Sequence, residues 1–516
     1  MSKKSTANDA PSPLIPALGL GIAIAVVVGN VIGSGIFLKP GTIAAASGNF
    51  GLIIGVWVAG GTLCILGGLC FAELAAMFPK AGGLYVYTRE AYGRPVGFLY
   101  GWNEVLFGKP ASLGALAVAF IGALGSALKW QPHAFVEVGI AIAMIVVMAI
   151  VNILGVIWGG RLQLVFTLIK AGFLALVAVA PFALMPFVEH SVELANYSSR
   201  IEPEYPELAK QIGIVLLAVM WAYNGWHGVT PLAEEIRNPQ RNIPLALLGG
   251  IGILIVLYVA ANFAYHGVLS MPEMAAQREH AAEAMLGKLL GSGGVAAMSA
   301  VIMCSTFGAI NTNLLQAPRI TYAMGRDGVF FRSLGQVHAT FRTPAAAIGL
   351  MAAMAILLIL TVAVAKQVVQ KPPAATPANG TANTLEKVAE EPVPTSLGPR
   401  IVHSLRNDSI FDLLTNFVIF SSSIFYTLAV LAVIVLRIRQ PDRPRPYRTF
   451  GYPVVPLLFV VVYVWFLSQV YTTNPLESRT GLFIIGLGIV AYFAYNRVAG
   501  GGKPQPSTDT GEPQNG

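Results

Sequence analysis

Gly33-Ser34-Gly35-Ile36-Phe37 interrupts the first long apolar segment of the chain, and Asn224-Gly225-Trp226-His227-Gly228 interrupts the sixth in a comparable way. A helix that crosses a bilayer satisfies its backbone groups internally, so a glycine-rich break at membrane depth frees backbone groups for another purpose. When two such breaks fall in corresponding positions of two halves, they indicate a solute site near the middle of the membrane. The two stretches therefore predict a helical membrane protein with a central binding site.

The bulk composition is that of a membrane protein. Of the 516 residues, 55% are hydrophobic and 11% are charged, and the mean hydropathy is +0.66. Soluble chains carry roughly 25% charged residues, and apolar stretches of about 18 residues or more predict membrane spans. About twelve such stretches lie near 15–38, 50–78, 95–126, 134–154, 162–187, 208–232, 243–268, 293–324, 344–366, 410–437, 452–472 and 480–497. We therefore expect an all-α integral membrane protein with about twelve transmembrane helices in a lipid bilayer.

The basic residues predict the orientation of the chain. Lys and Arg are more frequent in the loops that share a side with the N-terminus, such as 438–451 with Arg443, Arg445 and Arg448, than in the short loops on the other side. An excess of basic residues marks the cytoplasmic side of a membrane protein. Both termini are therefore expected in the cytoplasm, and the formal net charge of +8 reflects topology rather than affinity for nucleic acid.

The chain divides into a helical core and polar segments. The expected parts are a cytoplasmic tail at 1–14, a ten-helix core at 15–437, a basic cytoplasmic loop at 438–451, two appended helices at 452–497 and a disordered cytoplasmic tail at 498–516. Within the core, 367–409 is rich in Pro, Ala, Thr and Asn, which predicts a mobile extracytoplasmic loop. The two breaks lie five spans apart, and a repeat with an odd number of spans is inverted in its second copy. The core is therefore predicted to be a five-plus-five inverted repeat with helices 1 and 6 broken.

The two breaks have complementary chemistry. At Gly33, Ser34 and Gly35, amide N–H groups and the positive end of the following half-helix favour an anionic group, and a carboxylate suits that geometry. The turn that follows Trp221 would present carbonyl oxygens, which hold an ammonium group without a buried carboxylate. Together the breaks suit an α-amino acid, with Trp221 as a lid. The alternative for the first break is that its small residues serve close helix packing.

Three ionisable side chains at membrane depth are further candidates. Lys170 lies deep in the fifth span, where an ammonium is costly and indicates function. It stands where a sodium-coupled transporter would hold a cation, or it titrates, since buried lysines shift their pKa readily. Glu104 and Lys109 are five residues apart in the third span, and either a structural ion pair or a place in the cavity wall is open to them.

Four uncharged or weakly basic residues complete the candidate set. His227 either relays protons or is a hydrogen-bonded structural residue, while Asn311, Thr312 and Asn313 in the eighth span are candidates for the cavity lining.

No catalytic or cofactor motif is present in the sequence. Its three cysteines, Cys64, Cys70 and Cys304, lie in apolar segments, where cysteine is usually a small buried hydrophobe. The chain has no zinc pattern, no P-loop and no GxSxG motif. We therefore expect neither an enzyme nor a cofactor or metal.

Five motifs carry a resemblance to a known family over nearly the whole chain. They are GNVIGSGIF (29–37), CFAELAAMFPKAGGLYVYTREAYG (70–93), WAYNGWHGVTPLAEEIRNPQRNIPLAL (221–247), STFGAINTNLLQAPRITYAMGRDG (305–328) and RPYRTFGYP (445–453). In combination they resemble the amino acid–polyamine–organocation (APC) superfamily and, within it, the L-type amino acid transporters. The resemblance implies a twelve-helix secondary active transporter of neutral L-amino acids that works by alternating access, through sodium-independent exchange or proton coupling. A cationic amino acid or polyamine carrier and a non-transporting sensor are the alternatives.

The resemblance also implies roles for individual residues. The substrate carboxylate would meet Ser34 and Gly35, and the ammonium would meet carbonyls of the two breaks. The full substrate-binding set is Val31, Ile32, Gly33, Ser34, Gly35, Trp221, Ala222 and Asn224. Lys170 matches the lysine that occupies the sodium region in this family, which disfavours sodium coupling.

The chain departs from the family pattern at several positions. His227 stands where eukaryotic relatives usually have Asn, and Asn224 stands where they usually have Gly, so substrate preference does not carry over. Lys109-Pro110 replaces a more familiar Arg-Pro. The outer loop between spans three and four has no cysteine, so a disulfide-linked heavy chain is not expected. A chain without such a partner suits a bacterial inner membrane.

Overall fold

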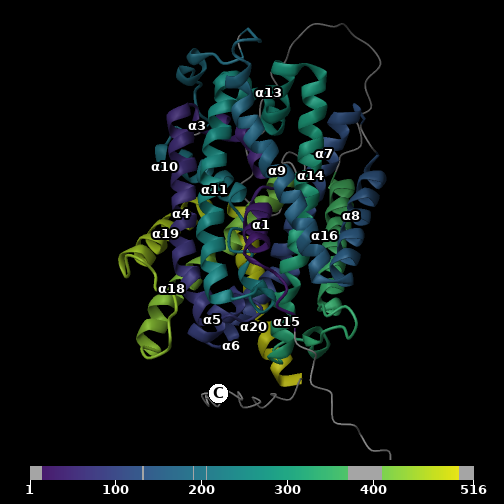
Figure 1. The fold of residues 1–516 in the computed structure, drawn as a ribbon, viewed down its shortest axis with the longest axis vertical. Helices are drawn as coiled ribbons and strands as arrows, with labels where there is room; N and C mark the ends of the chain where they lie inside the picture. The colour runs from purple at the N-terminus through teal and green to yellow at the C-terminus, as the bar shows by residue number, and fades with distance from the viewer. Residues whose placement is uncertain (1–13, 131–132, 190, 205, 370–409, 499–516) are drawn as a thin grey trace, which may run out of the picture.

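The computed structural model describes residues 14–130, 133–189, 191–204, 206–369 and 410–498, which form a bundle of long helices (Figure 1). The predicted tails, except residues 14 and 498, and the predicted loop beyond residue 369 lie outside these residues.

The described helices follow one another in twelve units that correspond to the twelve predicted spans. The first five are α1 (Leu20–Val31) with α2 (Gly35–Leu38), α4 (Phe50–Met77), α6 (Arg94–Asn103) with η1 (Glu104–Gly108) and α7 (Lys109–Leu128), α8 (Ala134–Leu154), and α9 (Val156–Leu184). The next five are α10 (Leu208–Ala222) with η3 (Thr230–Glu235), α11 (Pro239–Val268), α14 (Ser292–Gln316) with α15 (Pro318–Arg326), α16 (Ala345–Val369), and α18 (Ile410–Arg439). The last two are α19 (Val454–Thr473) and α20 (Pro475–Val498). The connections contain α3 (Pro40–Ser47), α5 (Leu84–Tyr92), η2 (Leu194–Ser198), α12 (Met271–Gln277), η4 (Arg278–His280), α13 (Ala281–Leu290) and η5 (Arg332–Gly335).

The length and apolar character of these helices suit a bilayer. In the described part of the chain, 11 helices are long and apolar enough to cross a membrane. The shorter apolar helix α10 stands at the place of the sixth span. The predicted all-α membrane protein with about twelve spans is thereby confirmed.

The two sets of five spans pack in matching ways. Helix α4 packs against α11, α7 against α14, and α8 against α16, so each of these helices touches its counterpart five spans later (Figure 1). Helix α1 packs against α11 and α9, and α10 correspondingly packs against α4 and α18. This correspondence is what a five-plus-five repeat requires.

The breaks differ in extent from the sequence expectation. In the first span α1 ends at Val31 and α2 begins at Gly35, so the break is shorter than 33–37, and Ile36 and Phe37 are helical. In the sixth span α10 ends at Ala222 and η3 begins only at Thr230, which makes that break longer.

The fifth span starts earlier than predicted. Helix α9 begins at Val156 rather than at 162, because Gly155 alone joins it to α8. Gly155 has a φ of 153°, which a residue with a side chain rarely adopts. Arg161 therefore lies within α9 and not in a loop.

Candidate functional site

A pocket lies where the two breaks meet. Its free volume, including the mouth, is about 370 Å³. The breaks supply Asn30, Val31, Gly33, Ser34, Gly35, Trp221, Asn224 and Gly225, while α7 supplies Lys109, Ser112 and Leu116, and α14 supplies Asn313. Six of the eight residues predicted for substrate binding therefore line one cavity, whereas Ile32 and Ala222 do not.

The break in the first span turns the chain sharply. The amide of Gly33 donates to the carbonyl of Val31 at 2.7 Å, after which α2 begins at Gly35. The first amides of a helix have no partner within that helix. The hydroxyl oxygen of Ser34, which is buried, has no hydrogen-bond partner among the described residues. This side of the pocket therefore carries donors and suits an anionic group.

The break in the sixth span is tied to the first by Asn30. The amide of Asn224 donates to the Trp221 carbonyl at 3.0 Å, and Gly225 follows with a φ of 95°. The Nδ2 of Asn30 donates to the Gly225 carbonyl at 2.8 Å. A Cβ on Gly225 would lie 2.1 Å from that Nδ2, so both the conformation and the contact require glycine. Asn30 therefore links the first break to the second and fixes their relative position.

Tyr258 of α11 makes a second link between the breaks. Its buried hydroxyl lies 2.8 Å from the carbonyl oxygen of Val31 and 3.0 Å from that of Ala222. The carbonyl of Ile32 instead accepts a hydrogen bond from Ser305 Oγ at 2.9 Å. Ile32 and Ala222 therefore contribute to the frame of the pocket rather than to its lining.

Trp221, which lines the pocket, forms an aromatic pair with Phe411 of α18. Trp221 is 7% exposed, and its ring lies 5.9 Å from that of Phe411 in an edge-to-face arrangement. Lys39 lies over the other ring of this pair, with Nζ 4.9 Å from the centre of Phe411. The same ammonium forms an ion pair with Asp412 and donates to Thr415 Oγ1 at 3.3 Å. These contacts link Lys39, at the end of α2, to α18 next to Trp221.

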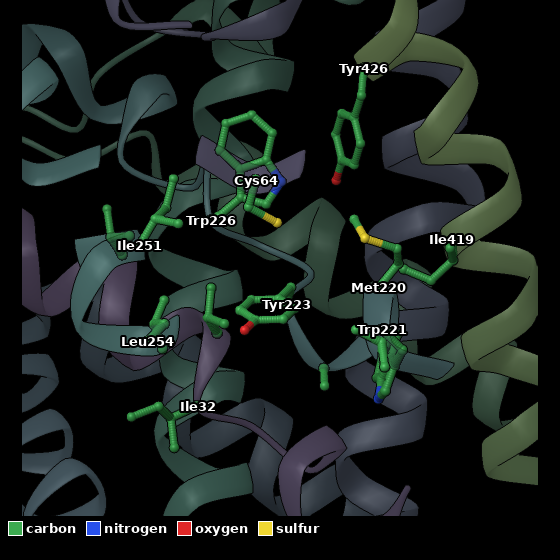
Figure 2. Close-up of a cluster of buried hydrophobic side chains, with 14 of the residues drawn as sticks. Ile32, Cys64, Met220, Trp221, Tyr223, Trp226, Ile251, Leu254, Ile419 and Tyr426 are labelled. Atoms are coloured by element: carbon green, nitrogen blue, oxygen red, sulfur yellow. The ribbon is translucent and has the colours of Figure 1, made fainter. Parts of the chain in front are cut away.

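The other tryptophan of the sixth-span break has a different environment. Trp226 is fully buried, and its ring packs 4.7 Å from that of Phe71. Figure 2 shows Trp221 and Trp226 in separate parts of the buried cluster. Trp226 is absent from the pocket lining, which agrees with a structural role.

Lys170 lies beside the pocket in the middle of α9. Its side chain is fully buried, and Nζ donates to the Gly29 carbonyl of α1 and lies 3.5 Å from the Ser305 carbonyl of α14. The amino group of Lys170 therefore lies against two backbone oxygens. It links α1 to α9 and α14 at the level of the break.

Glu104 and Lys109 form an ion pair because the third span is not a regular helix between them. Residues 104–108 form a π-helical turn, in which the Lys109 amide donates to the Glu104 carbonyl. Such a turn brings residues five apart onto one side, and Nζ lies 3.5 Å from Oε2. Lys109 lines the pocket, whereas Glu104 does not. Lys109 therefore both forms the ion pair and belongs to the cavity wall.

His227, Asn311 and Thr312 lie outside the pocket lining. The ring of His227 packs 4.8 Å from that of Tyr426. The side chains of Asn311 and Thr312 both donate to Oε1 of Gln163 in α9, at 3.3 Å and 2.6 Å. The latter pair therefore joins α14 to α9 instead of facing the solute site.

Of the three candidates in the eighth span, Asn313 lines the pocket, as predicted, and Asn311 and Thr312 do not. Successive helical residues point about 100° apart, so three in a row do not share one face. Gly225, which belongs to the second break, also lines the pocket, and Asn30, Ser112 and Leu116 are further lining residues that the sequence did not single out. The spacing of Lys109, Ser112 and Leu116, which fits one helix face, was a usable signal.

Known proteins resemble this chain over nearly its whole length. The family model described as "Amino acid permease" matches residues 18–493. The serine/threonine exchanger SteT of Bacillus subtilis is 29% identical over 93% of this chain and 97% of its own length. The human b(0,+)-type amino acid transporter 1 is 27% identical over 96% of this chain and 91% of its own length. The mouse Asc-type amino acid transporter 1 is 28% identical, covering 92% and 80%.

Proposed function

The chain belongs to the amino acid permease family, whose members transport amino acids across membranes, and from this premise we propose that it moves neutral L-amino acids by sodium-independent exchange or proton coupling. Transport would proceed by alternating access, in which the helices that carry the two breaks rock against the rest of the bundle. The relatives include a serine/threonine exchanger, which supports exchange as the first mode to test.

The observation that carries the proposal is the pair of facing breaks with opposite polarity. The first break offers the amides near Ser34 and Gly35, together with the buried hydroxyl of Ser34, to a carboxylate. Carbonyl oxygens near Val31 and Trp221 suit an ammonium group. A zwitterionic α-amino acid satisfies both sides at once.

Lys170 supports sodium independence. A sodium ion would need the backbone oxygens that Lys170 already contacts, namely those of Gly29 and Ser305. Two cations do not share such a buried site, because their repulsion is strong at low dielectric constant. Lys170 therefore acts as a fixed cation in place of sodium. The coupling partner is then a proton or a second amino acid.

The pocket wall disfavours the cationic and polyamine alternative. That reading needs an acidic residue in the pocket, for which Glu104 was the candidate. Glu104 is paired with Lys109 and lies off the lining, while Lys109 itself lines the cavity.

The membrane setting is proposed as follows. Both termini face the cytoplasm, the tails at 1–14 and 498–516 and the loop at 438–451 are cytoplasmic, and the membrane is a bacterial inner membrane. Cys64, Cys70 and Cys304 all lie within membrane-crossing helices, which argues against a disulfide-linked partner chain.

Purified protein in liposomes tests the function. We expect uptake of labelled neutral amino acids to depend on amino acid inside the vesicles or on a proton gradient, and not on sodium. The absence of flux under every condition, with binding retained, would favour the sensor alternative. Uptake that requires sodium would contradict the role given to Lys170.

A further inference from the structure

Outside the two breaks, the pocket is lined by residues of α7 and α14. Lys109, Ser112 and Leu116 share one face of α7, and Asn313 lies on α14, which packs against α7. The breaks offer mainly backbone groups, which suit the carboxylate and ammonium common to all amino acids. The α7 and α14 wall is therefore the part of the pocket left to meet the substrate side chain.

Lys109 determines the charge of this wall. It carries the one charge among the described residues that line the pocket. Its Nζ has a carboxylate oxygen of Glu104 at 3.5 Å, and Glu104 is only 3% exposed. An ammonium has three N–H donors and no acceptor, so one partner leaves donors for a group in the cavity. Ser112 and Asn313 add polar atoms beside it.

We propose that Lys109 selects substrates by their side chain, favouring small neutral side chains that carry a hydroxyl or carboxamide oxygen. This inference rests on the proposed function of the same site. A cationic side chain would meet a second cation at low dielectric constant. A substrate side chain that carries a carboxylate is attracted less strongly than by an unpaired lysine, because Glu104 already neutralises the ammonium of Lys109. An apolar side chain leaves the free N–H donors of Lys109 without a partner, which a hydrogen-bonding site penalises.

Threonine and valine give the sharpest comparison, because they have nearly the same shape and differ by a hydroxyl for a methyl group. In liposomes loaded with unlabelled amino acid, the wild-type chain should exchange threonine about tenfold more efficiently than valine at limiting concentration. Equal efficiencies would overturn the proposal. No exchange of any amino acid would instead contradict the proposed function, so the two failures are distinguishable.

Variants locate the preference at Lys109. Lys109→Met combined with Glu104→Gln removes both charges and leaves none buried alone, and the threonine-to-valine ratio should fall to about one while valine exchange continues. Lys109→Arg retains the donors and should retain the preference. Lys210→Met is the matched control, because Lys210 pairs with Glu207 at 3.0 Å and its side chain is 42% exposed. A double variant with the wild-type ratio would overturn the proposal, and where that variant does not fold the wild-type ratio decides.

Discussion

Gly35 and Ala222 bring the two broken helices into backbone contact. A Cβ atom on Gly35 would lie 2.5 Å from the Cα and 2.8 Å from the Cβ of Ala222. Real Cβ atoms do not approach other atoms so closely, and the obstructing atoms belong largely to backbone that cannot rotate away. The start of α2 and the end of α10 are therefore as close as glycine permits, and the geometry of the pocket depends on that contact.

Replacing Gly35 with Ala should separate the breaks and abolish or greatly reduce amino acid exchange. We expect flux, measured with labelled substrate in liposomes, to fall about fivefold or more, since an overpacked contact costs about 1–3 kcal/mol. Gly21→Ala in α1 is the control, because a Cβ there meets nothing within 4 Å and transport should persist. Wild-type flux in the Gly35 variant would show that the close approach is not needed.

Lys170→Ala should impair transport more than binding. The substitution leaves the carbonyls of Gly29 and Ser305 without the ammonium that contacts them, which removes a link between α1 and the helices beside it. Hydrogen bonds to charged groups contribute about 1.5–3 kcal/mol, so flux should fall about tenfold or more, or change its coupling ion. Exchange rates measured with and without sodium check this. Lys210→Ala should have no effect, and wild-type rates in the Lys170 variant would refute the role.

The ion pair between Lys39 and Asp412 should hold the Trp221 end of the pocket closed. Asp412→Asn removes one charge of the pair that joins α2 to α18. A cysteine placed at Ser112 in a background without the native cysteines should then react faster with a membrane-impermeant thiol reagent added outside. A loss of about 1.4 kcal/mol from the closed state corresponds to tenfold faster labelling. Unchanged labelling would mean that other contacts keep this end closed.

The protein should be less stable when only one of Arg319 and Glu235 is replaced than when both are replaced. Both side chains are fully buried, and Arg319 donates from Nε to Oε2 at 2.9 Å and from Nη2 to Oε1 at 2.8 Å. Arg319→Met leaves the buried carboxylate of Glu235 without its partner and should lower the free energy of unfolding by about 3–5 kcal/mol. Adding Glu235→Leu should recover most of that loss. Thermal unfolding in detergent compares the variants, and a single variant as stable as the wild type would contradict the expectation.

The sequence was sufficient for those features that depend on local composition. Apolar length predicted the spans, and glycine-rich interruptions predicted which helices break. The limits of the breaks were not predictable, because whether Ile36 continues a helix or Tyr223 ends one depends on contacts with other helices. Gly155 illustrates the same point, since a single glycine sufficed to join two spans where a loop was expected.

The candidate site divides in a similar way. Its backbone half was predictable, because the breaks lie in the sequence as contiguous motifs. Its side-chain half was predictable only in part. Lys109 and Asn313 were candidates for the lining, whereas Ser112 joins Asn313 only through the packing of α7 against α14. The ion pair of Lys109 with Glu104 also depends on a π-helical turn, which five-residue spacing alone does not reveal.

The hydroxyl of Tyr258 has a single hydrogen but two carbonyl neighbours, one at the end of each broken helix. That hydrogen is therefore shared between them, or points at one in preference to the other. An ammonium group at the Val31 oxygen would favour donation from Tyr258 to the oxygen of Ala222. Rotation about one C–O bond would thus couple occupancy of the first break to a hydrogen bond at the end of α10.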